Sequence, residues 1–211
     1  MPNLKNSYEK KKQKIRERLQ DFEIVWKKSD EDIFAELCFC LLTPQSRART
    51  ADKAIKNMIE KNILFSGNEK QILRELTSQG IRFSENKTKF ILEARKVFTN
   101  NGRIGIKSKL KEGSINSKRT WLVKNVKGFG YKLASHFLRN IGLGFELAIL
   151  DRHVLKNLVK HKIIDEIPKI LGRKQYLSIE EKMRKFSERM NIPMADLDLL
   201  FWSEETGEIF K

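Results

Sequence analysis

The chain has 211 residues, enough for one domain with a proper core or for two closely packed subdomains, and its 40% hydrophobic residues favour a globular protein over a disordered one. Forty-three Lys and Arg against 27 Asp and Glu give a formal net charge of +16, which favours a polyanionic partner, although a soluble lysine-rich protein would show the same surplus. No apolar run approaches the roughly 20 residues needed to span a bilayer, so we expect nucleic acid rather than a membrane.

Helical periodicity dominates the first half of the chain, and strand alternation is nearly absent throughout. A first helix is predicted over 7–27, and the acidic segment 29–32 is expected to cap a second one over 33–42. Thr43-Pro44-Gln45-Ser46 ends that helix. Further helices are predicted over 47–61, 69–79 and 85–100, and the basic stretch 103–113 is predicted to be a loop with one short turn.

The only two cysteines, Cys38 and Cys40, lie in the apolar run 33–42. On a helix their side chains diverge by about 200°, so they neither bridge each other nor chelate a metal together, and we expect buried thiols. An iron–sulfur cluster is excluded because four cysteines are needed. The lysine-rich segment 1–14 has no apolar core behind it, so we expect an intracellular protein of the cytoplasm or nucleoid.

The second half continues the helical pattern, which gives an all-α fold of about ten helices. One helix over 116–126 leads into Gly128-Phe129-Gly130, and another over 132–141 follows it. Asp151 is expected to cap the next helix. Ser178-Ile179-Glu180-Glu181 fits a capping box for a helix ending at Asn191, and Pro193 opens the last helix.

The glycine hairpin and the two charged residues after it carry most of the chemistry. Gly128 and Gly130 have no Cβ, so the hairpin backbone can approach another backbone closely. The helix that follows presents unpaired N–H groups, which suit a phosphate oxygen. Lys132 lies in the first turn of that helix, and Asp151 follows nineteen residues later. Alone, these two residues would be read as a solvated lysine and an ordinary N-cap; together they favour an active site.

This arrangement resembles the helix-hairpin-helix base-excision DNA glycosylases. The turn 41–46 is similar to the one that, in these enzymes, inserts a polar side chain into the gap left by the extruded base. The C-terminal segment 198–211 resembles the tail of the compact archaeal-type 8-oxoguanine DNA glycosylase/lyases. The residues that carry the match around the hairpin are Leu122, Val126, Gly128, Gly130, Lys132, Ala134, Asp151 and Val154.

The resemblance implies two helical subdomains flanking a DNA-binding cleft: 30–145 with the hairpin, and 1–29 plus 146–211 formed by both termini. It implies a monomer that removes 8-oxoguanine from double-stranded DNA, without a membrane and without a required cofactor; an ion at the hairpin carbonyls stays open. Lys132, as a free amine, would capture the sugar C1′ and form a Schiff base that permits β-elimination. Asp151 would stabilise the cationic sugar.

The other expected site residues serve base recognition and DNA binding. 8-Oxoguanine carries a proton on N7 that guanine lacks, so an acceptor must read the flipped base. The resemblance assigns this role to the extreme C-terminus, here the α-carboxylate of Lys211, with Trp202 as a stacking wall; a core tryptophan is the alternative. No metal site is expected. The expected DNA-binding residues are Gln45, Gly128, Gly130, Lys127, Arg82, Phe83 and His153.

Several alternatives stay open at this point. A helix-hairpin-helix module without catalysis would explain the charge and the glycines but not Lys132 with Asp151. A glycosylase/lyase for oxidised pyrimidines shares that pair, but such relatives commonly carry an iron–sulfur cluster that this chain cannot build. Phe83 fits core packing as well as a DNA contact, and His153 fits packing as well as phosphate binding.

Overall fold

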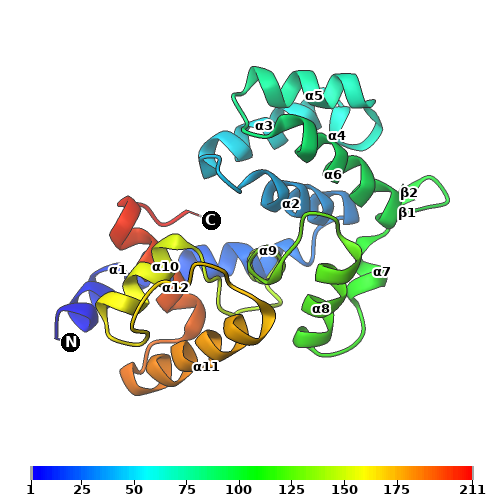
Figure 1. Cartoon of the computed structure of the whole chain (residues 1–211). Coiled ribbons are helices and arrows are strands. Elements are labelled where there is room, and N and C mark those ends of the chain that lie inside the picture. Colours follow the sequence, from blue (N-terminus) through cyan, green and yellow to red (C-terminus); the bar gives the residue numbers. More distant parts are fainter. Residues whose placement is uncertain (1, 211) are drawn as a thin grey trace. The chain divides into compact units, whose positions relative to one another are not determined.

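The computed structural model describes residues 2–210, which form two compact units. One, called here the terminal unit, comprises the chain up to Val25 and from Leu138 onwards; the other, the hairpin unit, is Trp26–Phe137 (Figure 1). Within the described residues there are twelve helices and one antiparallel pair of two-residue strands. The predicted all-α class is confirmed.

The hairpin unit is built around helix α2 (Asp30–Leu42). Every residue of Ile33–Leu42 is buried, because this helix is apolar all round and contacts several neighbours. Ser29 begins it with the predicted acidic cap, a capping box in which the Ser29 and Asp32 side chains each accept the other residue's N–H. Figure 1 shows α2 beside its contact partners α3 and α6.

The remaining elements of the hairpin unit lie close to their predicted ranges. Two short helices, α4 and α7, were not predicted as such, since four or five residues are too few to show periodicity. Asn101 and Gly102 form the turn between the two strands. The elements are α3 (Ala48–Glu60), α4 (Ile63–Ser66), α5 (Glu69–Ser78), α6 (Ser84–Phe98), β1 (Thr99–Asn100), β2 (Arg103–Ile104), α7 (Ile106–Leu110), α8 (Ile115–Asn125) and the first seven residues of α9 (Tyr131–Asn140), whose last three belong to the terminal unit.

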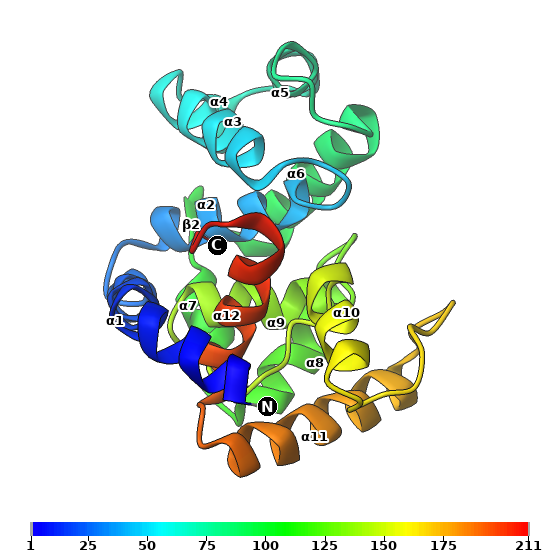
Figure 2. The same cartoon turned by 90° about the vertical axis from the view of Figure 1, so that its left-hand side faces the viewer.

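The terminal unit packs α1 (Pro2–Val25), α10 (Arg152–Lys160) and α11 (Arg173–Met190) against α12 (Met194–Thr206). Figure 2 shows α12 beside α1. The predicted start of α1 at residue 7 is wrong: Leu4 and Tyr8 are buried, and the Tyr8 hydroxyl donates to Asp196 Oδ2 at 2.7 Å. These contacts extend the helix toward the N-terminus.

The predicted capping box at Ser178 is also wrong, because α11 already begins at Arg173 with Gly172 as its N-cap. Tyr176 explains the earlier start. Its ring is buried, and its hydroxyl donates to the Ala148 carbonyl at 2.7 Å, which fixes the first turn of the helix. A tertiary contact therefore overrides a local sequence signal here.

The composition leads to two further predictions, one for the cysteines and one for membrane-spanning segments. Cys38 and Cys40 are both buried thiols, as predicted. Among residues 2–210, no helix is both long enough and apolar enough to cross a membrane.

Candidate active site

The hairpin joins α8 to α9, and its two glycines have different roles. Gly128 has φ +90°, and a Cβ built on it would lie 2.7 Å from the Phe90 ring, so only glycine fits there. An added Cβ on Gly130 would meet nothing within 4 Å. The Gly130 carbonyl accepts from the Ala134 N–H at 3.0 Å, which marks the start of α9. Gly128 shapes the turn, and Gly130 leaves its surface open to an approaching backbone.

Arg119 holds α8 against α9. It is 1% exposed, and its Nη1 donates to Ser135 Oγ at 3.3 Å. Its Nη2 donates to Asn116 Oδ1 at 2.8 Å, and its guanidinium lies 5.1 Å from the centroid of the Tyr131 ring. Tyr131, the residue before Lys132, therefore packs on the buried Arg119 side chain, and this contact fixes the first turn of α9.

Lys132 is the second residue of α9 and is half-buried. In this first turn the backbone N–H groups have no acceptor within the helix, so they face the direction from which an anion would approach. The predicted local setting of Lys132, a helix N-terminus directly after the hairpin, is confirmed.

Asp151 lies in the terminal unit as the N-cap of α10, as predicted. Its Oδ1 accepts from the Val154 N–H at 2.8 Å, and the carboxylate is half-buried. The positive end of the helix dipole favours its negative charge. One Asp151 oxygen is thus held by the helix in a fixed orientation.

A buried ion pair lies behind this cap in the terminal unit. Asp198 Oδ2 is 3.8 Å from Arg139 Nη1, and both side chains are buried. Burial raises the pKa of Asp198 to about 7, against the opposing effect of the Arg139 guanidinium and with a further increase from the Asp151 charge. Arg139 also lies over the Phe22 ring, at 4.6 Å from its centroid.

His153 lies two residues after Asp151 in a cluster of charged side chains. Its Nδ1 is 3.8 Å from Glu205 Oε2, and Lys156 Nζ is 3.4 Å from the same oxygen. Within residues 2–210, no three His, Cys, Asp or Glu side chains are grouped so that they would hold a metal ion. The phosphate role of His153 stays a prediction.

The two residues expected to read the base belong to the C-terminal segment. Trp202 is half-buried on α12. Lys211 lies outside the described residues. The residue before it is held by α1: Arg18 Nε donates to the Phe210 carbonyl at 2.6 Å, while Arg18 Nη1 pairs with Asp21 at 2.9 Å. The tail is therefore tied to α1 at its last described residue.

The other expected DNA contacts are brought together in the hairpin unit. Gln45, Arg82 and Phe83 are all exposed, and Ser46 joins their two turns because its Oγ accepts from the Arg82 N–H at 3.3 Å. Phe83 is 58% exposed, which excludes the core packing that the sequence left open. Lys127, in the hairpin itself, is also exposed.

The family model described as 8-oxoguanine DNA glycosylase matches residues 15–192. The chain belongs to this family. An 8-oxoguanine DNA glycosylase/AP lyase of Fusobacterium nucleatum is 45% identical to it, over 97% of this chain and 94% of the relative.

Solved structures agree with this membership of the 8-oxoguanine DNA glycosylase family. The Methanocaldococcus jannaschii 8-oxoguanine glycosylase/lyase, crystallised with a 15mer DNA containing 8-oxoguanine, superposes with a TM-score of 0.89 at 35% identity, covering 100% of both chains. The Thermotoga maritima 8-oxoguanine DNA glycosylase gives a TM-score of 0.87 at 33% identity, over 100% of this chain and 97% of that one. The predicted family and fold are confirmed.

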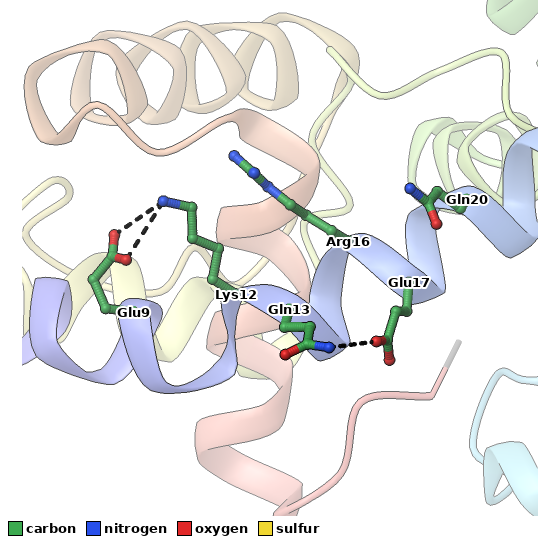
Figure 3. A pocket seen from close by; sticks show the side chains of 6 residues that line it. All are labelled: Glu9, Lys12, Gln13, Arg16, Glu17 and Gln20. Carbon is green, nitrogen blue, oxygen red and sulfur yellow. Dashed lines mark hydrogen bonds and ion pairs between the residues drawn. The ribbon is translucent and has the colours of Figure 1, made fainter.

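The surface of this 8-oxoguanine DNA glycosylase family member also has a depression that is lined by side chains of α1 alone. It has a volume of about 370 Å³ and runs along α1 (Figure 3). Lys12 pairs with Glu9 at 3.3 Å, and Gln13 Nε2 donates to Glu17 at 3.0 Å. Because these side chains pair with each other along one helix face, we assign them no catalytic role. The lining residues are Glu9, Lys12, Gln13, Arg16, Glu17 and Gln20.

Proposed function

We propose that this chain removes 8-oxoguanine from double-stranded DNA and then cleaves the strand at the abasic site through a Schiff base on Lys132. The observation that carries the proposal is the position of Lys132 in the first turn of α9, directly after the Gly128-Phe129-Gly130 hairpin, in a chain of the 8-oxoguanine DNA glycosylase family. A binding module without catalysis would need the glycines but not this lysine.

The proposed reaction starts at the amine of Lys132. The neutral Lys132 Nζ attacks C1′, and the electrons of the C1′–N bond leave with the base, which takes up a proton. The sugar ring opens to give an imine between Nζ and C1′. Loss of a C2′ proton then expels the 3′ phosphate as the C3′–O bond breaks, and water releases the enzyme from the imine. The covalent steps need only an amine, water and proton transfers, so the proposed reaction needs no cofactor.

Asp151 is proposed to act on the same sugar. Positive charge develops on the sugar as the base departs, and a fixed carboxylate lowers the energy of that state. The N-cap bond from Val154 orients the carboxylate before the substrate arrives.

The remaining residues are proposed to hold and read the DNA. Gly128, Gly130 and Lys127 would bind the backbone at the hairpin, and His153 a further phosphate. Gln45 would fill the space of the flipped base, with Arg82 and Phe83 against the opposite strand. Trp202 and Lys211 would recognise the base itself.

Borohydride trapping tests the proposal. A duplex containing 8-oxoguanine opposite cytosine should give a covalent complex with the unmodified protein, and Lys132→Gln should abolish it while leaving DNA binding. A parallel panel with oxidised pyrimidines tests the second glycosylase class. A protein that binds the duplex but never traps would contradict the proposal and favour a passive binding module.

A further inference from the structure

Two exposed turns of the hairpin unit share an unusual backbone conformation. Gln45 has φ +55° and Phe83 has φ +57°, both in the left-handed region that disfavours residues with a Cβ. Both turns hold residues that we propose to contact DNA. Such conformations persist only where surrounding contacts fix them, so each turn needs a support.

The support for both turns is Lys87, on the buried face of α6. This side chain is 3% exposed, and its Nζ donates to the Leu42 carbonyl at 2.8 Å, the Pro44 carbonyl at 2.7 Å and Ser46 Oγ at 3.0 Å. An ammonium has three N–H donors, and here three oxygens on either side of Gln45 accept them.

Ser46 extends this support to the second turn. Its Oγ accepts from Lys87 and also from the Arg82 N–H, at 3.3 Å. The Phe83 carbonyl accepts from the Lys87 N–H at 3.0 Å, as the first turn of α6 requires. Both turns therefore depend on one buried residue and one hydroxyl.

The same helix reaches the glycine hairpin. Phe90, one turn after Lys87, lies against Gly128, where a Cβ would come within 2.7 Å of its ring. One face of α6 thus contacts all three segments of the hairpin unit that we propose to touch DNA.

We infer that Lys87 is a positioning residue of the glycosylase reaction, which acts through Ser46 to keep the Gln45 and Arg82–Phe83 turns in one fixed arrangement on duplex DNA. The inference rests on the proposed function. The Lys87 side chain is too deeply buried to touch DNA itself, so its charge serves the two turns. Burial lowers the pKa of Lys87 to about 8, but this value still lies above neutral pH, so the ammonium with its three donors remains the main form there.

The test compares the cleavage rates of two substrates, only one of which depends on the Gln45 and Arg82–Phe83 turns. A duplex with 8-oxoguanine opposite cytosine requires a filled gap and a contacted opposite strand, whereas a single-stranded oligonucleotide with a preformed abasic site requires neither. We expect Lys87→Met to lower the ratio of duplex to single-strand single-turnover rates at least about tenfold, the factor for one charge-assisted hydrogen bond. Lys87→Arg, which keeps the charge and donors, should restore part of the ratio.

Lys89→Met is the matched control, because Lys89 is an exposed lysine on the same helix. Equal ratios for Lys87→Met and Lys89→Met would overturn the inference while the proposed function stands. Should Lys87→Met fail to fold, Ser46→Ala removes only the shared hydroxyl and should lower the same ratio about threefold; an unchanged ratio in Ser46→Ala would then overturn the inference. An unmodified protein that cleaves neither substrate would overturn both the inference and the proposed function.

Discussion

In the hairpin unit the turns that we propose to touch DNA are tied to the buried ammonium of Lys87, whereas in the terminal unit the tail is tied to α1 through Arg18, whose side chain is 23% exposed. Hydrogen bonds from a buried charge are stronger than those near solvent, where water competes. The turns should therefore be preformed before DNA binds. The tail, which we propose to read the base, rests on a weaker contact.

Each unit also buries a charged group whose pKa is shifted by burial, Lys87 in the hairpin unit and Asp198 in the terminal unit. Lys87 donates to three neutral oxygens, while Asp198 lies 3.8 Å from the charged Arg139. In both cases burial shifts the pKa in the direction that favours the neutral form. The pKa falls to about 8 for Lys87 and rises to about 7 for Asp198. Burying a charge costs free energy. Lys87 and Asp198 nevertheless lie buried next to segments that we propose to act on DNA.

The largest effect is expected at Asp151, the catalytic candidate of the terminal unit. Asp151→Asn should lower single-turnover excision by about 10²–10³-fold, because the sugar cation loses a fixed negative charge. Asparagine is an equally good N-cap, so stability and DNA affinity should stay near normal. Excision rates and equilibrium binding on one duplex check this. Equal losses of rate and affinity would identify Asp151 as a structural cap only.

A smaller effect is expected from the tail contact. Arg18→Gln removes the bond to the Phe210 carbonyl and should lower discrimination between 8-oxoguanine and guanine about tenfold, with folding intact. Asp21→Asn is the matched control, since it removes the partner of Arg18 Nη1 but leaves the Nε bond. Discrimination that stays the same in Arg18→Gln would remove this contact from base recognition.

Salt dependence separates contact residues from positioning residues in the hairpin unit. Lys127 is exposed in the hairpin, so Lys127→Gln should reduce the slope of log affinity against log salt by about 0.9, the value for one phosphate. Lys87→Met should leave the slope unchanged, because this buried lysine neutralises no phosphate. A reduced slope in Lys87→Met would mean that Lys87 reaches the DNA.

The dependence of stability on pH should have opposite signs in the two units. The folded pKa of Lys87 is about 8 and its usual value is 10.5, so the unfolded chain binds more protons between them. The stability of the protein relative to Lys87→Met should rise by about 3 kcal/mol as pH increases through this window.

For Asp198 the folded pKa is about 7 against a usual 3.8, so the folded chain binds more protons in that range. Stability relative to Asp198→Asn should fall by about 3 kcal/mol as pH rises from 4 to 7. Denaturant unfolding across pH measures both differences. Slopes of the same sign would contradict the assignment of the buried charges.

Much of the fold could be predicted from sequence, because long helices show their periodicity locally. The start of α11 could not, since the Tyr176 hydroxyl fixes it through Ala148, 28 residues away. The Lys132 setting and the Asp151 cap were local features and were predicted correctly. How the two turns of the hairpin unit are held together was not.

The two buried charged residues that were not predicted, Lys87 and Arg119, nevertheless lie at positions in the sequence that indicate burial. Lys87 lies four residues before Ile91, on the apolar face of α6, and Arg119 lies three residues before Leu122, on that of α8. A charged residue at an apolar position marks a buried charge, but its partners come from segments far away in the chain. The Ser46 hydroxyl, 41 residues from Lys87, is such a partner.

The most direct test of the account is to locate the covalent adduct. After borohydride reduction with an 8-oxoguanine duplex, nuclease and protease digestion followed by mass spectrometry should find the sugar remnant on the peptide that contains Lys132. An adduct on another lysine, or no adduct despite excision of the base, would contradict the assignment of Lys132 as the nucleophile.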